Sequence, residues 1–95
     1  MYTIMAKLTA RKGQEQRLVE ALAGLAKASR EEAGCITYIP HVVANNPAEI
    51  VIFEQYVDEA ALQVHAQSPH FKAVFDTRKD ELLGGPLEIT VLHEF

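Results

Sequence analysis

The sequence predicts an α+β domain with the element order β-α-β-β-α-β, which is the order of ferredoxin-like folds. Three observations support this prediction. The chain has 95 residues, the size of one domain. It contains two apolar stripes of helical period, and runs of strand-like residues flank them. The usual solution for this order is a four-stranded antiparallel sheet with both helices on one face, and we expect residues 1–95 to form it.

The first part of the chain predicts a strand followed by a long helix. Residues Tyr2 to Thr9 are mainly β-branched or apolar, which is typical of a strand. From Glu15 to Ala33 the apolar period becomes helical, with positions i, i+4, i+7 and i+11 on one face. These positions are Leu18, Leu22, Leu25 and Ser29. We expect Gly34 to end the helix in a left-handed backbone conformation.

A hairpin and a second helix are predicted next. Strands over Cys35–Ala44 and Glu49–Val57 flank Asn45-Asn46-Pro47, whose residue types favour a turn. Asp58 is a good N-cap for a helix from Glu59 to about Gln67. The hairpin therefore leads directly into the second helical segment.

We expect the second helix to be broken and then to restart. Ser68 suits a helix N-cap, and Pro69 suits the first helical position. The restarted helix would place five residues on one face before Gly84-Gly85-Pro86 ends it. These residues are Phe71, Val74, Phe75, Arg78 and Leu82. Leu87 to Phe95 then forms the final strand.

The predicted strands carry apolar residues on both faces. In the second strand, Tyr38 and Val42 lie on one face and Ile39 and Val43 on the other. Two helices cover only one face of a sheet. We therefore expect the other face to meet a second subunit, which predicts a homodimer.

Composition excludes several classes of protein. The formal net charge is −4, and the sequence has no basic stripe, which argues against nucleic-acid binding. No apolar run approaches the length of a membrane span, and the N-terminus lacks the pattern of a signal peptide. The single cysteine, Cys35, excludes an internal disulfide. These features predict a cytoplasmic protein that binds neither nucleic acid nor membrane.

His65 is the principal candidate for chemistry. It follows Leu62 by three residues and Ala61 by four, which places it on the apolar stripe of the second helix. A buried imidazole needs a partner, and its pKa is open to shifting. Position alone leaves two interpretations open: a core histidine bonded to a backbone carbonyl, or a ligand-binding or proton-transfer group.

Other polar residues have weaker signals. Glu54 lies inside an apolar strand, where it could orient a histidine, act as a base or form a salt bridge. Phe53 points to the opposite face. Arg78 either lies at the rim of the apolar stripe or holds an anionic ligand. His70 follows His65 by five residues, which misses the i, i+4 spacing of helical zinc pairs, so we expect no metal site.

Three segments resemble the antibiotic biosynthesis monooxygenase family. Glu31-Glu32-Ala33-Gly34-Cys35 running into Tyr38 is similar to the family's segment before its second strand. Ile52 to Tyr56, followed by Asp58 to Leu62, resembles its "E-x-W/Y…DEAAL" segment. His65 to Lys72 matches its "H-x-x-S/T-P-H-F-K" signature. The resemblance covers the whole chain and implies a dimeric α+β barrel.

The resemblance also implies a function. Many members are similar to quinol monooxygenases, which oxidise quinols or polycyclic phenols with O2 and use no metal, flavin or haem. By this resemblance, His65 is the candidate base and Glu54 its orienting partner or a substrate contact, with no cofactor. The expected substrate-binding residues are Tyr38, Phe53, Tyr56, His70, Phe71, Phe75 and Arg78.

Two alternatives remain open at this point. One is an isomerase or related enzyme for a small oxygenated metabolite, of the autoinducer-2 breakdown type, which would work without O2. The other is a non-catalytic ligand-binding dimer, which would bind aromatics without turnover. Haem-degrading relatives use Asn, Trp and His where this chain has Ala6, His65 and Phe75, so the resemblance argues against haem degradation.

Overall fold

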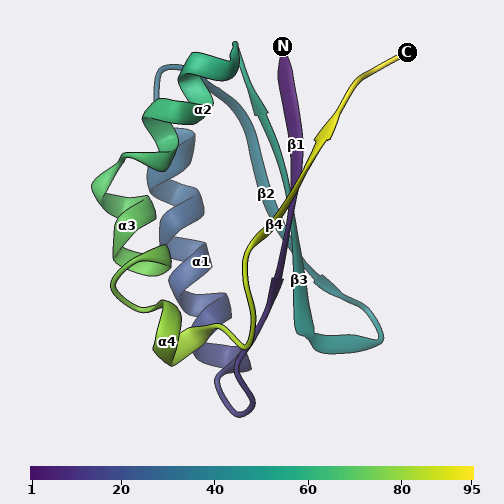
Figure 1. Cartoon of the computed structure of the whole chain (residues 1–95), viewed down its shortest axis with the longest axis vertical. Coiled ribbons are helices and arrows are strands. Elements are labelled where there is room, and N and C mark those ends of the chain that lie inside the picture. The colour runs from purple at the N-terminus through teal and green to yellow at the C-terminus, as the bar shows by residue number, and fades with distance from the viewer.

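The computed structural model describes residues 1–95 and contains one four-stranded antiparallel sheet (Figure 1). The strands are β1 (Tyr2–Thr9), β2 (Cys35–Val43), β3 (Asn46–Tyr56) and β4 (Glu88–Leu92), in the order β2-β3-β1-β4. The ferredoxin-like prediction is confirmed. The last strand is shorter than expected, because only its central residues pair with β1.

The helix α1 (Glu15–Arg30) packs along the sheet on the face shared by all helices (Figure 1). Its buried residues are Leu18, Leu22, Leu25, Ala26 and Ser29. This is the predicted apolar face, widened by Ala26. Burial of three leucines at about 1.5–3 kcal/mol each makes this face a large part of the core.

Gly34 differs from its predicted role. It is not left-handed, since Gly13 is the glycine with positive φ, and Glu31 is the C-cap of α1. A Cβ added at Gly34 would lie 2.5 Å from the Cβ of Ala61. Gly34 therefore allows the chain before β2 to pass very close to the next helix.

The second helical region consists of three short helices. They are α2 (Glu59–Ala66), α3 (Pro69–Phe75) and α4 (Lys79–Leu82). The predicted caps are confirmed, since Asp58 Oδ1 accepts from Ala61 N and Ser68 Oγ accepts from Phe71 N. None of the helices is both long and apolar enough to cross a membrane.

The predicted continuation of the restarted helix to Leu82 is wrong. α3 ends at Phe75, and the chain turns before α4 begins at Lys79. Arg78 consequently leaves the face of Phe71 and Phe75, and its guanidinium donates to the carboxylate of Glu81 in solvent. Leu82 still reaches the core, because α4 returns it there.

The two faces of the sheet have different environments. The inner face is buried beneath the helices, and its aliphatic residues include Ile4, Ala6, Leu8, Ile50 and Ile52. On the outer face, Phe53 lies opposite Met5 on β1 and Ile39 on β2. Met5 and Ile39 are exposed and Phe53 is half-buried. As the strand pattern predicted, both faces carry apolar residues, and this chain covers only one.

Candidate active site

His65 lies near the end of α2 and is almost completely buried, with 2% of its surface exposed. Aromatic rings surround it, since the ring centroids of Tyr38, Tyr56 and Phe71 lie 5.4, 5.5 and 5.3 Å from that of His65. Its predicted place on the apolar stripe is confirmed. Its partner, however, is not a backbone carbonyl.

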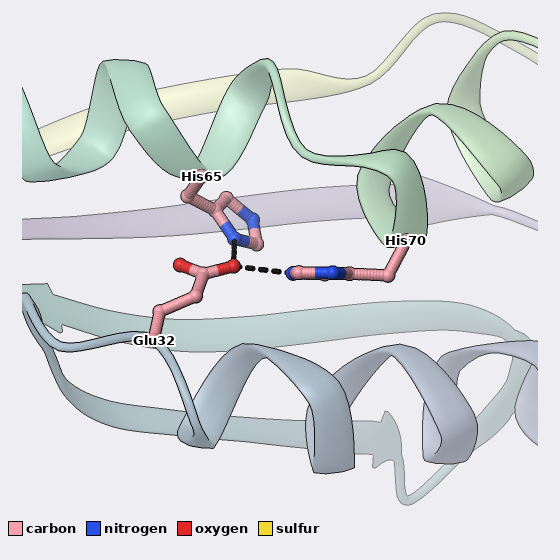
Figure 2. A group of neighbouring side chains, drawn as sticks. All are labelled: Glu32, His65 and His70. Carbon is pink, nitrogen blue, oxygen red and sulfur yellow. Dashed lines mark hydrogen bonds and ion pairs between the residues drawn. The ribbon is translucent and has the colours of Figure 1, made fainter.

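Glu32 is the partner of His65. The Nδ1 atom of His65 lies 3.0 Å from Oε2 of Glu32, and Nε2 of His70 contacts the same oxygen (Figure 2). A carboxylate only accepts hydrogen bonds, so it favours the neutral His65 tautomer with the proton on Nδ1. Nε2 of His65 is then free to accept a proton.

Glu32 belongs to no predicted site, although its segment carries part of the family resemblance. It follows the C-terminal end of α1, where the helix dipole disfavours a carboxylate. That unfavourable position was the available signal. The position of Glu32 could not predict that its partners are His65 and His70, because they lie 33 and 38 residues further along the chain.

Glu54 lies on the other side of the imidazole. Its Oε1 is 4.0 Å from Nε2 of His65, and the hydroxyl of Tyr56 donates to the same oxygen at 2.5 Å. Only 4% of Glu54 is exposed. The two carboxylates therefore flank one buried imidazole, each near a different ring nitrogen.

Burial changes the proton affinities of these groups. Desolvation raises the pKa of Glu54 to about 7, with the Tyr56 hydrogen bond opposing this and the charge of Glu32 adding to it. Desolvation lowers the pKa of His65, while the hydrogen bond and charge of Glu32 oppose that change. Burial also raises the pKa of Tyr38 and of Tyr56, so both remain phenols at neutral pH.

A cavity of about 150 Å³ lies between the inner face of the sheet and helices α2 and α3. Its wall is mainly apolar, and its titratable groups are His65, Glu54 and the phenol of Tyr38. The apolar wall includes Ile4, Tyr38, Ile52, Leu62, Phe71 and Phe75. A cavity of this volume suits a single aromatic ring.

A wider groove adjoins this cavity. The groove has a volume of about 510 Å³ and shares Phe71, Phe75 and Leu87 with the cavity wall. A ligand with more than one ring could extend along this shared wall. The reactive ring would remain beside His65.

The structure brings together most of the predicted site residues. Tyr38, Phe71 and Phe75 line the cavity with His65 and Glu54. Tyr56 does not line the cavity, but its hydroxyl donates a hydrogen bond to Glu54. Glu54 points inward, as its register partner Ile4 on the inner face does, because paired strand residues lie on the same face of a sheet. All these residues belong to one site beneath the helices.

Three predicted substrate-binding residues lie elsewhere. Phe53 is on the outer face of the sheet, opposite Met5, because neighbouring strand residues point to opposite faces. Arg78 is in solvent, because α3 ends before it. His70 is outside the cavity and contacts Glu32.

A cluster suited to a metal ion also exists. Glu32, His65 and His70 have potential ligand atoms that all lie within 4.8 Å of one another. The spacing of His65 and His70 along the chain predicted no metal site. That prediction did not include a carboxylate contributed from the end of α1.

The fold and site define a small α+β protein with a buried histidine-carboxylate pair beside an apolar cavity. The family model described as antibiotic biosynthesis monooxygenase matches residues 1–77. The chain belongs to this family, as its motifs predicted.

Individual relatives agree with this assignment. The chain is 31% identical over 93 residues to "Probable quinol monooxygenase YgiN" of Escherichia coli K12, covering 87% of this chain and 89% of that protein. The crystal structure of PA3566 from Pseudomonas aeruginosa has a TM-score of 0.92 and 32% identity, covering 99% of this chain and 93% of that one. The structure of Rv0793 from Mycobacterium tuberculosis has a TM-score of 0.88 and 30% identity, covering 99% and 94%.

Proposed function

We propose that this protein is a cofactor-independent monooxygenase that oxidises a quinol or a related electron-rich aromatic with O2. The observation that carries the proposal is the arrangement of His65. Oε2 of Glu32 lies 3.0 Å from its Nδ1, which favours a proton on that nitrogen, and its Nε2 lies 4.0 Å from Oε1 of Glu54 at the cavity wall. The family and the name of the relative YgiN support the same class of reaction.

The first step is removal of a proton from the substrate. A ring hydroxyl in the cavity transfers its proton to Nε2 of His65, and Glu32 stabilises the imidazolium that forms. Glu54 lies close enough to Nε2 to contact the same hydroxyl. The resulting phenolate is a much better electron donor than the phenol.

The phenolate then reacts with O2. It transfers one electron to O2, and the two radicals combine to form a ring peroxide anion. The imidazolium of His65 returns its proton to this anion, which gives a ring hydroperoxide. Loss of water leaves one oxygen atom on the ring, so a quinol and O2 give a hydroxyquinone and water. The quinol supplies all four electrons, and no external reductant is required.

The cavity wall supports this chemistry. Tyr38, Phe71 and Phe75 offer aromatic surfaces against which a substrate ring can pack. The mainly apolar wall limits the access of water, which would compete for the hydrogen bonds of the reacting groups. Glu54 and His65 orient the hydroxyl within this apolar space.

The experiment is O2 uptake by metal-stripped protein with a panel of quinols, and ¹⁸O2 labelling of the product. We expect uptake above the autoxidation blank, one labelled oxygen in the product, and a loss of about 10²–10⁴-fold in His65→Ala. His41→Ala is the matched control, because His41 is exposed on β2. Uptake that is unchanged in a folded His65→Ala protein would refute the role of His65.

The same assay under anaerobic conditions separates the alternative functions. An isomerase of a small anionic metabolite would still turn over without O2, although Arg78 is outside the cavity and paired with Glu81. A ligand-binding protein would bind quinols and leave them unchanged. Either result would replace the monooxygenase proposal.

We also propose that the active species is a homodimer in which the outer faces of two sheets pack together. Met5, Ile39 and Phe53 form an apolar area on that face. A second copy of the chain supplies a surface of the same character, as isologous packing requires.

A further inference from the structure

Glu32, His65 and His70 meet from three separate elements of the chain. Glu32 follows α1, His65 is in α2 and His70 is in α3 (Figure 2). We propose that these three side chains bind a divalent transition-metal ion of the zinc class. Imidazole nitrogens and a carboxylate oxygen are ordinary zinc ligands, and three protein ligands leave the fourth position for water.

The geometry of the cluster needs little change to hold an ion. The potential ligand atoms all lie within 4.8 Å of one another, and Nδ1 of His65 is 3.0 Å from Oε2 of Glu32. Zinc-ligand bonds of about 2.0–2.2 Å place tetrahedral ligand atoms about 3.3–3.6 Å apart. Both imidazoles already point at Oε2 of Glu32. A metal ion placed among these three side chains would bind one ligand atom from each.

The carboxylate of Glu32 can accept further hydrogen bonds or bind a cation. Its Oε1 is buried and has no hydrogen-bond partner, although a buried acceptor without a partner costs free energy. The hydrogen-bond partners of Glu32 are the two histidines, and no lysine or arginine forms a salt bridge with it. Glu54 adds a second carboxylate on the far side of His65, which further favours a cation.

Solvent reaches the cluster from outside the cavity. The exposed fractions of the side chains rise from 2% at His65 to 13% at Glu32 and 26% at His70. An open groove lined by Gln63, Gln67 and these last two residues leads to the site. An ion can therefore arrive without passing through the substrate cavity.

A bound ion would affect the face of His65 that lines the cavity. The ion occupies Nδ1, so a neutral imidazole must carry its proton on Nε2. Nε2 then donates to Glu54 and cannot accept a proton from a substrate. This effect on catalysis rests on the proposed quinol oxidation. The bound ion would inhibit that oxidation, which itself requires no metal.

The binding test uses the tag-free full chain, treated with EDTA and titrated with Zn²⁺ by calorimetry. We expect one Zn²⁺ per chain, and we expect Glu32→Gln and His70→Ala each to weaken binding at least about tenfold. His41→Ala, which removes an exposed histidine far along β2, is expected to bind as the wild type does. Circular dichroism confirms that each variant is folded.

Two results would overturn the site. One is the absence of stoichiometric binding. The other is equal binding by wild type, folded Glu32→Gln and folded His70→Ala, which would indicate only scattered surface histidines.

A second measurement tests the effect on His65 without substrate. ¹⁵N spectra of the histidine rings should show the His65 proton on Nδ1 before Zn²⁺ and on Nε2 after it. An unchanged tautomer in the zinc-bound protein would refute the proposed inhibition. If the protein oxidises no quinol at all, calorimetry and the ring spectra still decide the metal site, so the two proposals can fail separately.

Discussion

Two carboxylates flank the imidazole of His65, and they differ in how they are held. Glu32 contacts two histidines, whereas Glu54 accepts a hydrogen bond from Tyr56 and is almost completely buried. Burial of a charge without a full set of partners disfavours the ionised form. Glu54 is therefore the residue whose charge should affect folding most.

Replacing Glu54 by Gln should change how stability depends on pH. The folded-state pKa of about 7 is above the ordinary value of 4.5, so the wild type loses stability as pH rises from 4.5 to 7. The full loss is about 3 kcal/mol, at about 1.4 kcal/mol per pKa unit. We expect Glu54→Gln to lack this loss and to be more stable than wild type at about pH 8.

Urea unfolding of EDTA-treated protein across this pH range measures the effect. The difference between the two proteins should disappear below pH 4.5, where Glu54 is protonated in both states. Glu20→Gln, on the exposed side of α1, is the control. A constant difference at every pH would contradict the raised pKa.

The position of the site depends on how closely neighbouring elements approach each other. Gly34 lets the segment that carries Glu32 pass against α2, where a Cβ would meet Ala61 at 2.5 Å. A small change there would move Glu32 away from His65. The contact between segments, more than any single helix, holds the carboxylate in place.

Gly34→Ala tests this contact. We expect a loss of about 1–3 kcal/mol of stability, as for other cases of overpacking, and a decrease in quinol oxidation. Gly24→Ala is the matched control, because Gly24 is in α1 with open space around it. The control should gain about 0.5–1 kcal/mol from its better helix propensity. Equal effects of the two changes in urea unfolding would show that the close approach is unimportant.

Local patterns predicted the elements well and the contacts between distant segments less well. The caps at Asp58 and Ser68 and the buried face of α1 follow from neighbouring residues, so the sequence was sufficient for them. The contact between Glu32 and His65 joins residues 33 positions apart, so the local periodicity of the sequence could not predict it. The end of α3 at Phe75 was missed, because the apolar spacing continued to Leu82 across a turn.

For the whole molecule, the outer face of the sheet is the main unexplained surface. It presents Phe53 between Met5 and Ile39. All the helices lie on the other side of the sheet (Figure 1). Exposed apolar areas of this kind usually mark an interface. The proposed homodimer would cover it.

Phe53→Arg should convert the dimer to a monomer, because it places a charge at the centre of this face. Light scattering during size-exclusion chromatography should give twice the 10.5-kDa chain mass for wild type and the single mass for the variant. Val64→Glu, on the exposed side of α2, should remain dimeric. A wild-type mass of one chain would refute the dimer.

The order of the strands has a consequence for how the protein is assembled. β2 and β3 are neighbours in the chain and can pair early. β1 pairs on one side with β4, whose residues are more than 80 positions away, so this pairing is expected to form late. Leu87, just before that last strand, and Ile89, within it, form part of the cavity wall. The cavity therefore exists only once the slowest pairing is complete. A ligand that fills it binds the finished molecule alone, and it should slow the release of β4 during unfolding.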